Sequence, residues 1–260
     1  MVNKPWYPSA YWQNVFAFNH LDDFAAIWNL QINRVEPGNE RRGGWSYVAL
    51  HTLKLPEGGT VDVYIKRQQN HLCRSILPTI VKGRPTFLRE FKNLQRLNKA
   101  NVAVPEILYF EQRAKNNQVI LILRALDQYI SLDKLQAQHI SFALKRKISA
   151  SIAETVRRLH QSHLHHNCLF EKHIFIRYDN NLHCPIHVVL IDLEKAKLSC
   201  SRIRNMWQDL SKMHRRQQGW SNTDMLRFYK DYRGKGKLNF FDRVSIKYFQ
   251  WKNKKRYILL

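Results

Sequence analysis

The chain has 260 residues, of which 44% are hydrophobic and 12% aromatic, with nine Gly and eight Pro. This composition predicts a globular protein and excludes an intrinsically disordered one. The formal net charge of +23 favours an anionic partner, such as nucleic acid, anionic lipid or a phosphorylated glycan.

The four cysteines are scattered through the chain without CxxC spacing, which argues against a zinc site or a disulfide framework and suits a reducing compartment. The N-terminus lacks the apolar core of a signal peptide. No apolar run reaches the length of a membrane span. We therefore expect a cytoplasmic protein, with peripheral attachment to a membrane left open.

Residues 1–35 are rich in aromatic side chains and include a helix-like segment at 21–28. A turn-rich loop at 36–46 then separates two strand candidates, of which the second is 47–53. Gly43 and Gly44 in this loop would let backbone amides approach a phosphate closely. A Gly-Gly hairpin also occurs without any ligand.

The strand predicted at 61–66 places its apolar residues on one face, so Lys66 points to the other. A helix is predicted at 87–97, with Thr86 as its N-cap. Glu90 lies on or beside the inward apolar stripe of this helix. Because an inward carboxylate needs a cation, the sequence predicts a pair between Lys66 and Glu90.

Two more strands are predicted at 104–110 and 118–123, which makes five strand candidates with one helix after the third. Apolar residues at helical spacing then predict a helix at 141–162. A strand-rich N-terminal half therefore meets a helix-rich C-terminal half near residues 124–131.

A histidine-rich loop spans residues 159–176, and a buried strand candidate further on ends at Asp192. His163, His165 and His166 are too close in sequence to share one helix face, although a strand or loop would still allow two of them to bind a metal. The residues alone leave this metal site open.

The order of these elements resembles the protein-kinase-like fold. More narrowly, the chain is similar to the lipopolysaccharide kinase family, which phosphorylates core sugars (Kdo or heptose), in its InaA-like branch. The stretches that carry the resemblance are Arg41–Ser46, Ile65–Gln68, Pro85–Phe91, Cys168–Phe175 and Ile191–Glu194.

The resemblance implies an α+β, two-lobe fold. Residues 1–35 would form an N-terminal extension. Residues 36–126 would form a nucleotide-covering N-lobe with a small antiparallel sheet and one helix. Residues 127–260 would form a mainly helical C-lobe that carries the catalytic loop, the metal-binding Asp and a basic C-terminal helix.

The resemblance also implies ATP and Mg²⁺ as cofactors. Lys66 would pair with the nucleotide phosphates and be oriented by Glu90, and Gly43 and Gly44 would cover the phosphates. Asp192 would hold Mg²⁺. Asp209 matches the helix-borne Asp that braces the catalytic loop, although an ordinary helix carboxylate would give the same pattern.

The sequence departs from the kinase pattern in the catalytic loop, where a His-x-Asp-x-x-x-x-Asn motif is expected. After His166, Cys168 stands where the Asp belongs and His173 where the metal-binding Asn belongs. A thiol accepts a proton poorly, and imidazole binds Mg²⁺ less well than oxygen. Either His166 or Glu171 is a candidate substitute for the missing base.

Two functions therefore remain open. The first is an ATP-dependent phosphotransferase acting on a lipopolysaccharide core sugar at the cytoplasmic face of the inner membrane. The second is a pseudokinase that binds nucleotide and acts as a regulatory or scaffold protein, related to stress. The short distance in sequence between Asp192 and Asp209 leaves no room for a long peptide-docking segment, which favours a glycan or small-molecule acceptor.

The expected partner is an anionic glycan or the lipopolysaccharide core. The run Lys247–Arg256 interleaves aromatic and cationic residues, as in a helix that lies on an anionic membrane, although a solvated helix face has the same composition. Nucleic acid is a less favoured partner, because the chain has no helix-turn-helix, zinc-finger or RNP pattern.

Overall fold

The computed structural model describes residues 4–35, 37–41, 43–73, 83–136, 138, 140–179, 183–216, 220–234 and 236–257. Arg42, which belongs to one of the resembling stretches, and, within the run Lys247–Arg256, the side chains of Gln250 and of residues 252–256 lie outside this description. The chain divides into two compact units. Unit 1 comprises Met1–Leu94 and Pro105–Asp127, and unit 2 comprises Gln95–Val104 and Gln128–Leu260.

Unit 1 is built on a five-stranded antiparallel sheet with strand order β1-β2-β3-β5-β4. Its strands are β1 (Asn39–Arg41), β2 (Gly44–Lys54), β3 (Thr60–Gln69), β4 (Ile107–Arg113) and β5 (Gln118–Arg124). The four strands predicted from residue 47 onward are confirmed. The expected strand before residue 36 is wrong, because the first strand pairs inside the predicted loop, where Gly43 turns the chain at φ 75°.

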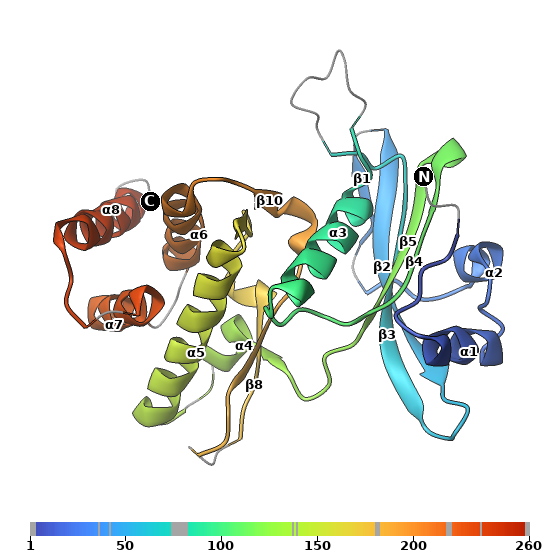
Figure 1. The fold of residues 1–260 in the computed structure, drawn as a ribbon, viewed down its shortest axis with the longest axis horizontal. Coiled ribbons are helices and arrows are strands. Elements are labelled where there is room, and N and C mark those ends of the chain that lie inside the picture. Colours follow the sequence, from blue (N-terminus) through green and yellow to red (C-terminus); the bar gives the residue numbers. More distant parts are fainter. Residues whose placement is uncertain are drawn as a thin grey trace. The chain divides into compact units, whose positions relative to one another are not determined.

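Helices cover both faces of this sheet: α1 (Ala10–Phe18) and α2 (Phe24–Asn29) lie on one face and α3 (Thr86–Lys99) on the other (Figure 1). The first two helices pack their apolar residues onto the inward residues of β3, β4 and β5. The predicted helix at 21–28 begins later than expected because Asp23 is its N-cap, accepting the N–H of Ala26 at 2.6 Å. The residues predicted as an extension are thus part of the core of unit 1.

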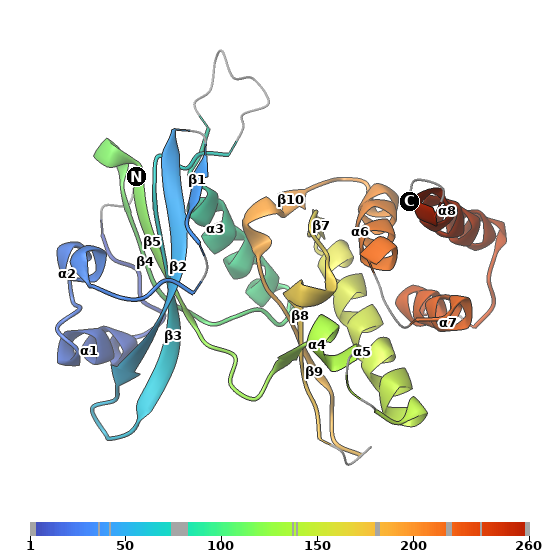
Figure 2. The same cartoon turned by 180° about the vertical axis from the view of Figure 1, so that it is seen from behind.

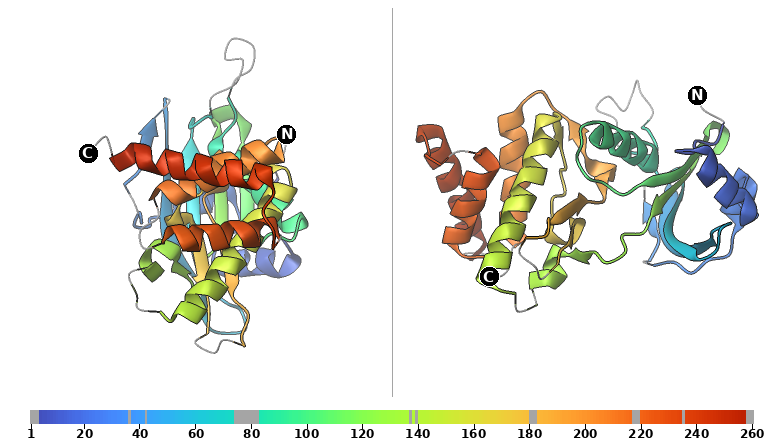
Figure 3. Two further views of the ribbon diagram at one scale, coloured as in Figure 1. Left: turned by 90° about the vertical axis from the view of Figure 1, so that its left-hand side faces the viewer. Right: turned by 60° about the horizontal axis from the view of Figure 1, so that its bottom comes forward.

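Unit 2 is mainly helical, as Figures 2 and 3 show. Its helices are α4 (Leu132–Gln136), α5 (Phe142–Gln161), α6 (Arg202–Arg216), α7 (Asn222–Arg233) and α8 (Phe240–Tyr257). Strands β6 (Ile130–Ser131), β8 (Ile174–Arg177) and β9 (His187–Leu190) form one small sheet, and β7 (Leu164–His165) pairs with β10 (Lys197–Leu198). The helix predicted at 141–162 is confirmed as α5, and Ser141 caps it by accepting the N–H of Leu144.

Short 3₁₀ turns, η1 (Ala114–Asn116), η2 (Glu171–His173) and η3 (Leu193–Lys195), complete the described elements. Among these elements, no helix is both long enough and apolar enough to cross a membrane. The predicted α+β class is confirmed, with an antiparallel sheet in one unit and a predominance of helix in the other.

Candidate active site

A buried ion pair in unit 1 joins β3 to α3. The Nζ atom of Lys66 lies 2.7 Å from Oε1 of Glu90, and the two side chains are 15% and 1% exposed. The Nζ atom also lies 5.5 Å from the ring centre of Phe87. Because the apolar face of β3 points to α1 and α2, Lys66 is directed to the α3 side of the sheet. The predicted pairing of Lys66 with Glu90 is confirmed.

Gly43 and Gly44 lie at the turn between β1 and β2, and each has a backbone reason to be glycine. Gly43 has φ 75° and open space where a Cβ would stand. A Cβ on Gly44 would lie 2.1 Å from the carbonyl oxygen of Gln69 at the end of β3, so any side chain would force the strands apart. The phosphate-covering role of these glycines stays a prediction.

In unit 2, the carboxylate of Asp209 on α6 holds the backbone of the histidine-rich loop. Its oxygens accept the backbone N–H groups of His166 at 2.6 Å and Asn167 at 2.8 Å, and Asn167 has φ 64°. Burial raises the pKa of Asp209, but the hydrogen bond from His160 and the neighbouring donors outweigh it, so the net pKa is lowered. The predicted bracing contact of Asp209 is confirmed.

The side chain of His166 is fully buried and fixes the backbone that leads to Asp192. Its Nε2 lies 2.9 Å from the carbonyl oxygen of Ile191, which can only accept, so Nε2 carries a proton. Burial lowers the pKa of His166 to about 4, so the ring is neutral at pH 7. Its Nδ1 is buried and has no hydrogen-bond partner in the described part of the chain.

Asp192 follows β9 in the left-handed conformation, with φ 59° and ψ 56°. Its Oδ2 lies 3.2 Å from Nε2 of His173, which comes from η2, and the Asp192 side chain is 29% exposed. The Nδ1 atom of His173 lies 2.8 Å from the carbonyl oxygen of Cys168. The structure therefore brings together the predicted metal-binding Asp192 and the residue that stands in the place of the metal-binding Asn.

The described residues do not support a metal site made of histidines alone. None of their His, Cys, Asp and Glu side chains form a group of three or more placed to hold a metal ion. A divalent cation at Asp192 and His173 would therefore need ligands other than the described His, Cys, Asp and Glu side chains.

The two remaining predicted catalytic residues differ in environment. Cys168 is partly exposed, and burial raises the pKa of its thiol more than nearby Lys195 lowers it. Glu171 is only 8% exposed, and its Oε1 accepts a hydrogen bond from Nε2 of Gln136 at 2.9 Å. Their roles in proton transfer stay predictions.

Sequence reasoning missed three residues that support the loop. Lys212 on α6 donates from Nζ to the backbone oxygen of Asn167 at 2.5 Å and to its Oδ1 at 2.6 Å. His160 lies between Tyr232 and Asp209, with ring-nitrogen distances of 2.8 Å to the Tyr232 hydroxyl and 3.2 Å to Oδ2 of Asp209. The spacing of Asp209 and Lys212 on one face of a helix was an available signal.

Two features together define a kinase-like protein. The unit with the sheet contains a buried Lys–Glu pair, and in the helical unit an Asp braces a loop near an Asp at the end of a strand. A model of the lipopolysaccharide kinase (Kdo/WaaP) family matches residues 25–232, and the chain belongs to this family.

Two known proteins illustrate the relationship. Protein InaA of Escherichia coli (strain K12) is 26% identical over 200 residues, which cover 75% of this chain and 88% of InaA. A solved structure described as WaaP in complex with acyl carrier protein superposes with a TM-score of 0.69, covering 97% of each chain at 18% identity. The latter similarity shows that the two chains share a fold.

Proposed function

We propose that this chain is an ATP-dependent phosphotransferase that phosphorylates a sugar hydroxyl of the lipopolysaccharide core. The observation that carries the proposal is the contact between Lys66 and Glu90, at 2.7 Å. In kinases of this fold, such a pair orients the lysine toward the nucleotide phosphates. A lysine used only for stability would gain little from this site, because a buried ion pair adds little net stability.

The residues around Asp192 fit a divalent cation. Asp192 offers a partly exposed carboxylate oxygen, and His173 offers Nε2 on the same side while its Nδ1 is bonded to a backbone carbonyl. Metal-ligating histidines have this second hydrogen bond as a rule. The cation would neutralise charge on the phosphates, and ATP would supply further oxygen ligands. Lys66, Glu90, Gly43 and Gly44 keep their proposed roles toward the nucleotide.

The catalytic loop offers no strong general base at the position where a kinase of this fold has one. The raised pKa of Cys168 leaves a neutral thiol at pH 7, and burial lowers the pKa of His166 to about 4, so neither side chain is a good proton acceptor for a sugar hydroxyl. General-base catalysis contributes about 10²–10⁴-fold to rate, whereas phosphoryl transfer depends mostly on positioning and charge. We therefore propose slow transfer in which His166 positions the loop. The raised pKa of Cys168 favours a second candidate, a nucleotide-binding protein without transfer activity.

The proposed partner is an anionic glycan presented at a membrane surface. On α8, the exposed residues Phe240, Val244 and Trp251 share one side of the helix with Lys247, at spacings of i, i+4, i+7 and i+11. Phe240 is 82% exposed and Trp251 is 51% exposed. An apolar stripe with cationic residues on a chain of net charge +23 is typical of a helix that lies on anionic lipid.

The test combines binding with transfer. Calorimetric titration with ATP and Mg²⁺ or Mn²⁺ is compared between the wild type and Asp192→Asn, and radiolabelled phosphate transfer is then measured with purified core oligosaccharide. Metal-dependent binding with transfer supports the kinase. Binding without transfer supports the nucleotide-binding candidate, and the absence of binding under all metals overturns both.

A further inference from the structure

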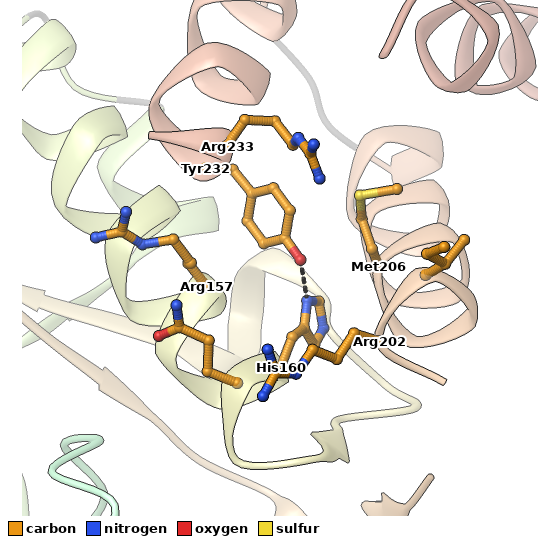
Figure 4. A pocket seen from close by; sticks show the side chains of 8 residues that line it. Arg157, His160, Arg202, Met206, Tyr232 and Arg233 are labelled. Carbon is orange, nitrogen blue, oxygen red and sulfur yellow. Dashed lines mark hydrogen bonds between the residues drawn. The ribbon is translucent and has the colours of Figure 1, made fainter. Parts of the chain in front are cut away.

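A pocket in unit 2 lies between three helices, and its lining includes none of the residues assigned above to the nucleotide. Its volume is about 180 Å³, and its walls come from α5, α6 and α7, as Figure 4 shows. The lining residues are Arg157, His160, Gln161, Arg202, Ile203, Met206, Tyr232 and Arg233. Three arginine residues, one from each helix, thus line one small space whose lining includes no carboxylate, and Figure 4 shows the guanidinium of Arg157 on the opposite side of the Tyr232 ring from that of Arg233.

The positive charge of this pocket is only partly balanced. Arg233 is paired with the buried Asp242 at 2.9 Å. Arg157 lies 4.0 Å from Glu154, which is already bonded to Arg158 at 2.5 Å, and its Nε is buried without a hydrogen-bond partner in the described residues. None of the ion pairs among the same described residues includes Arg202. Two of the three cations are therefore available to an anion.

The shape and chemistry of the pocket favour a phosphate group. Arginine binds phosphate through paired N–H donors. Arg202 lies in the first turn of α6, so the positive end of the helix dipole also attracts an anion there. The volume is below the roughly 300–1,000 Å³ of pockets for drug-sized ligands. Ile203, Met206 and the Tyr232 ring supply an apolar wall for a small attached group.

Two residues that line the pocket, Tyr232 and His160, are linked by hydrogen bonds to the loop at His166 and Asn167. Figure 4 shows the hydroxyl of Tyr232 directed at Nδ1 of His160, at 2.8 Å. On its other side, the same imidazole contacts Asp209, which holds the N–H groups of His166 and Asn167. An anion held by arginines of three helices would fix the α5–α6 contact between His160 and Asp209.

We propose that this pocket binds a phosphate monoester the size of a small sugar phosphate, and that its occupancy stabilises the loop at His166 and Asn167 through Tyr232, His160 and Asp209. The binding part of the proposal does not depend on the activity proposed above. The effect on the loop makes the pocket a regulatory site.

The first experiment uses matched arginine variants of the full chain. The probes are glucose 6-phosphate and inorganic phosphate, with binding measured by calorimetry. We expect Arg157→Gln and Arg202→Gln to weaken binding about tenfold or more, because each loses a charge-assisted contact. The exposed variants Arg204→Gln and Arg243→Gln carry the same change in net charge outside the pocket and should stay within about twofold. Equal weakening by all four variants, or no saturable binding, overturns the proposal.

A second arm separates the possible sources of the phosphate. Vesicles containing phosphatidic acid are compared with glucose 6-phosphate. Binding of the vesicles alone, with dependence on Arg157 and Arg202, overturns the small-molecule proposal and assigns the pocket to a lipid headgroup. The double variant Lys66→Met, Glu90→Gln should bind glucose 6-phosphate like the wild type, and a loss there would mean that the probe occupies the nucleotide site.

The coupling is tested by hydrogen exchange at the amides of His166 and Asn167. We expect glucose 6-phosphate to slow this exchange several-fold in the wild type. In Tyr232→Phe, which keeps all three arginines but loses the bond to His160, we expect binding to persist and the slowing to be reduced. Unchanged exchange in the wild type at saturation overturns the regulatory part, and equal slowing in both proteins overturns the route through Tyr232.

Discussion

The imidazole of His173 connects Cys168 to Asp192 in a defined orientation. Its Nδ1 lies 2.8 Å from the carbonyl oxygen of Cys168, and its Nε2 lies 3.2 Å from Oδ2 of Asp192. The carbonyl can only accept, so Nδ1 carries a proton. Two states of the ring therefore fit the distance from Nε2 to the carboxylate. In the first, Nε2 also carries a proton and donates it to the carboxylate. In the second, Nε2 has a lone pair, and Nε2 and the carboxylate bind the same cation.

The identity of the preferred metal tests this arrangement. Imidazole is a better ligand for Mn²⁺ than for Mg²⁺, which prefers oxygen. We expect ATP to bind more tightly with Mn²⁺ than with Mg²⁺, and His173→Asn to move the preference toward Mg²⁺ by about tenfold. Calorimetry with each metal measures this. His187→Asn, an exposed position on β9, is the control, and an unchanged preference in His173→Asn would contradict the assignment.

The Lys66–Glu90 pair predicts different results for single and double variants. Lys66→Ala leaves the buried Glu90 without its cation and should lower the free energy of unfolding by about 3–5 kcal/mol. Lys66→Met with Glu90→Gln removes both charges and should lose less stability while still losing nucleotide affinity. Urea unfolding and ATP titration measure the two effects, with the exposed Lys92→Ala as control. Wild-type ATP affinity in the double variant would exclude Lys66 from the nucleotide site.

Stability should depend on pH through His166. Its pKa is about 4 in the folded chain against an ordinary value of 6.5, so the unfolded chain binds more protons between these values. The contribution is therefore complete above pH 6.5 and is lost as the pH falls through 4, with a total of about 3 kcal/mol. The free energy of unfolding, measured with urea at several pH values, should depend less steeply on pH in His166→Gln than in the wild type or in His187→Gln. Equal slopes in all three proteins would argue against a neutral buried ring.

Asp209 acts in a lower pH range. Because its pKa is lowered from 3.8, its stabilising contribution is complete above that value and is lost only as the pH falls further. Asp209→Asn should lower the free energy of unfolding at pH 7 by about 3–5 kcal/mol, since the amide cannot satisfy the same set of donors. Hydrogen exchange at His166 and Asn167 should accelerate in this variant. The exposed Asp133→Asn serves as control, and unaltered exchange would contradict the bracing role.

The exposed apolar side of α8 predicts membrane binding. We expect Phe240→Ser combined with Trp251→Ser to weaken sedimentation with anionic vesicles about tenfold or more, because both side chains would be buried in the lipid interface. Phe18→Ser, which removes a 51% exposed aromatic residue from α1, should have little effect. Equal loss in both proteins would indicate general charge attraction without a role for α8.

The sequence by itself determined the features that depend on local periodicity. Alternation along residues 61–66 directed Lys66 away from the apolar face, and helical spacing placed Glu90 inward, so their contact followed from two local patterns. The long helix α5 and the strand before Asp192 were determined in the same way. The order of these elements along the chain carried the resemblance to the lipopolysaccharide kinase family.

Only the tertiary structure decided how the loop residues are used. His173 reaches Asp192, and His166 reaches the Ile191 carbonyl, because the backbone takes positive φ at Asn167 and at Asp192, which no periodic pattern encodes. The pocket behind the loop depends on Tyr232 meeting His160 across 72 residues of chain. Such contacts arise from helix packing between distant segments, and sequence spacing carries no information about them.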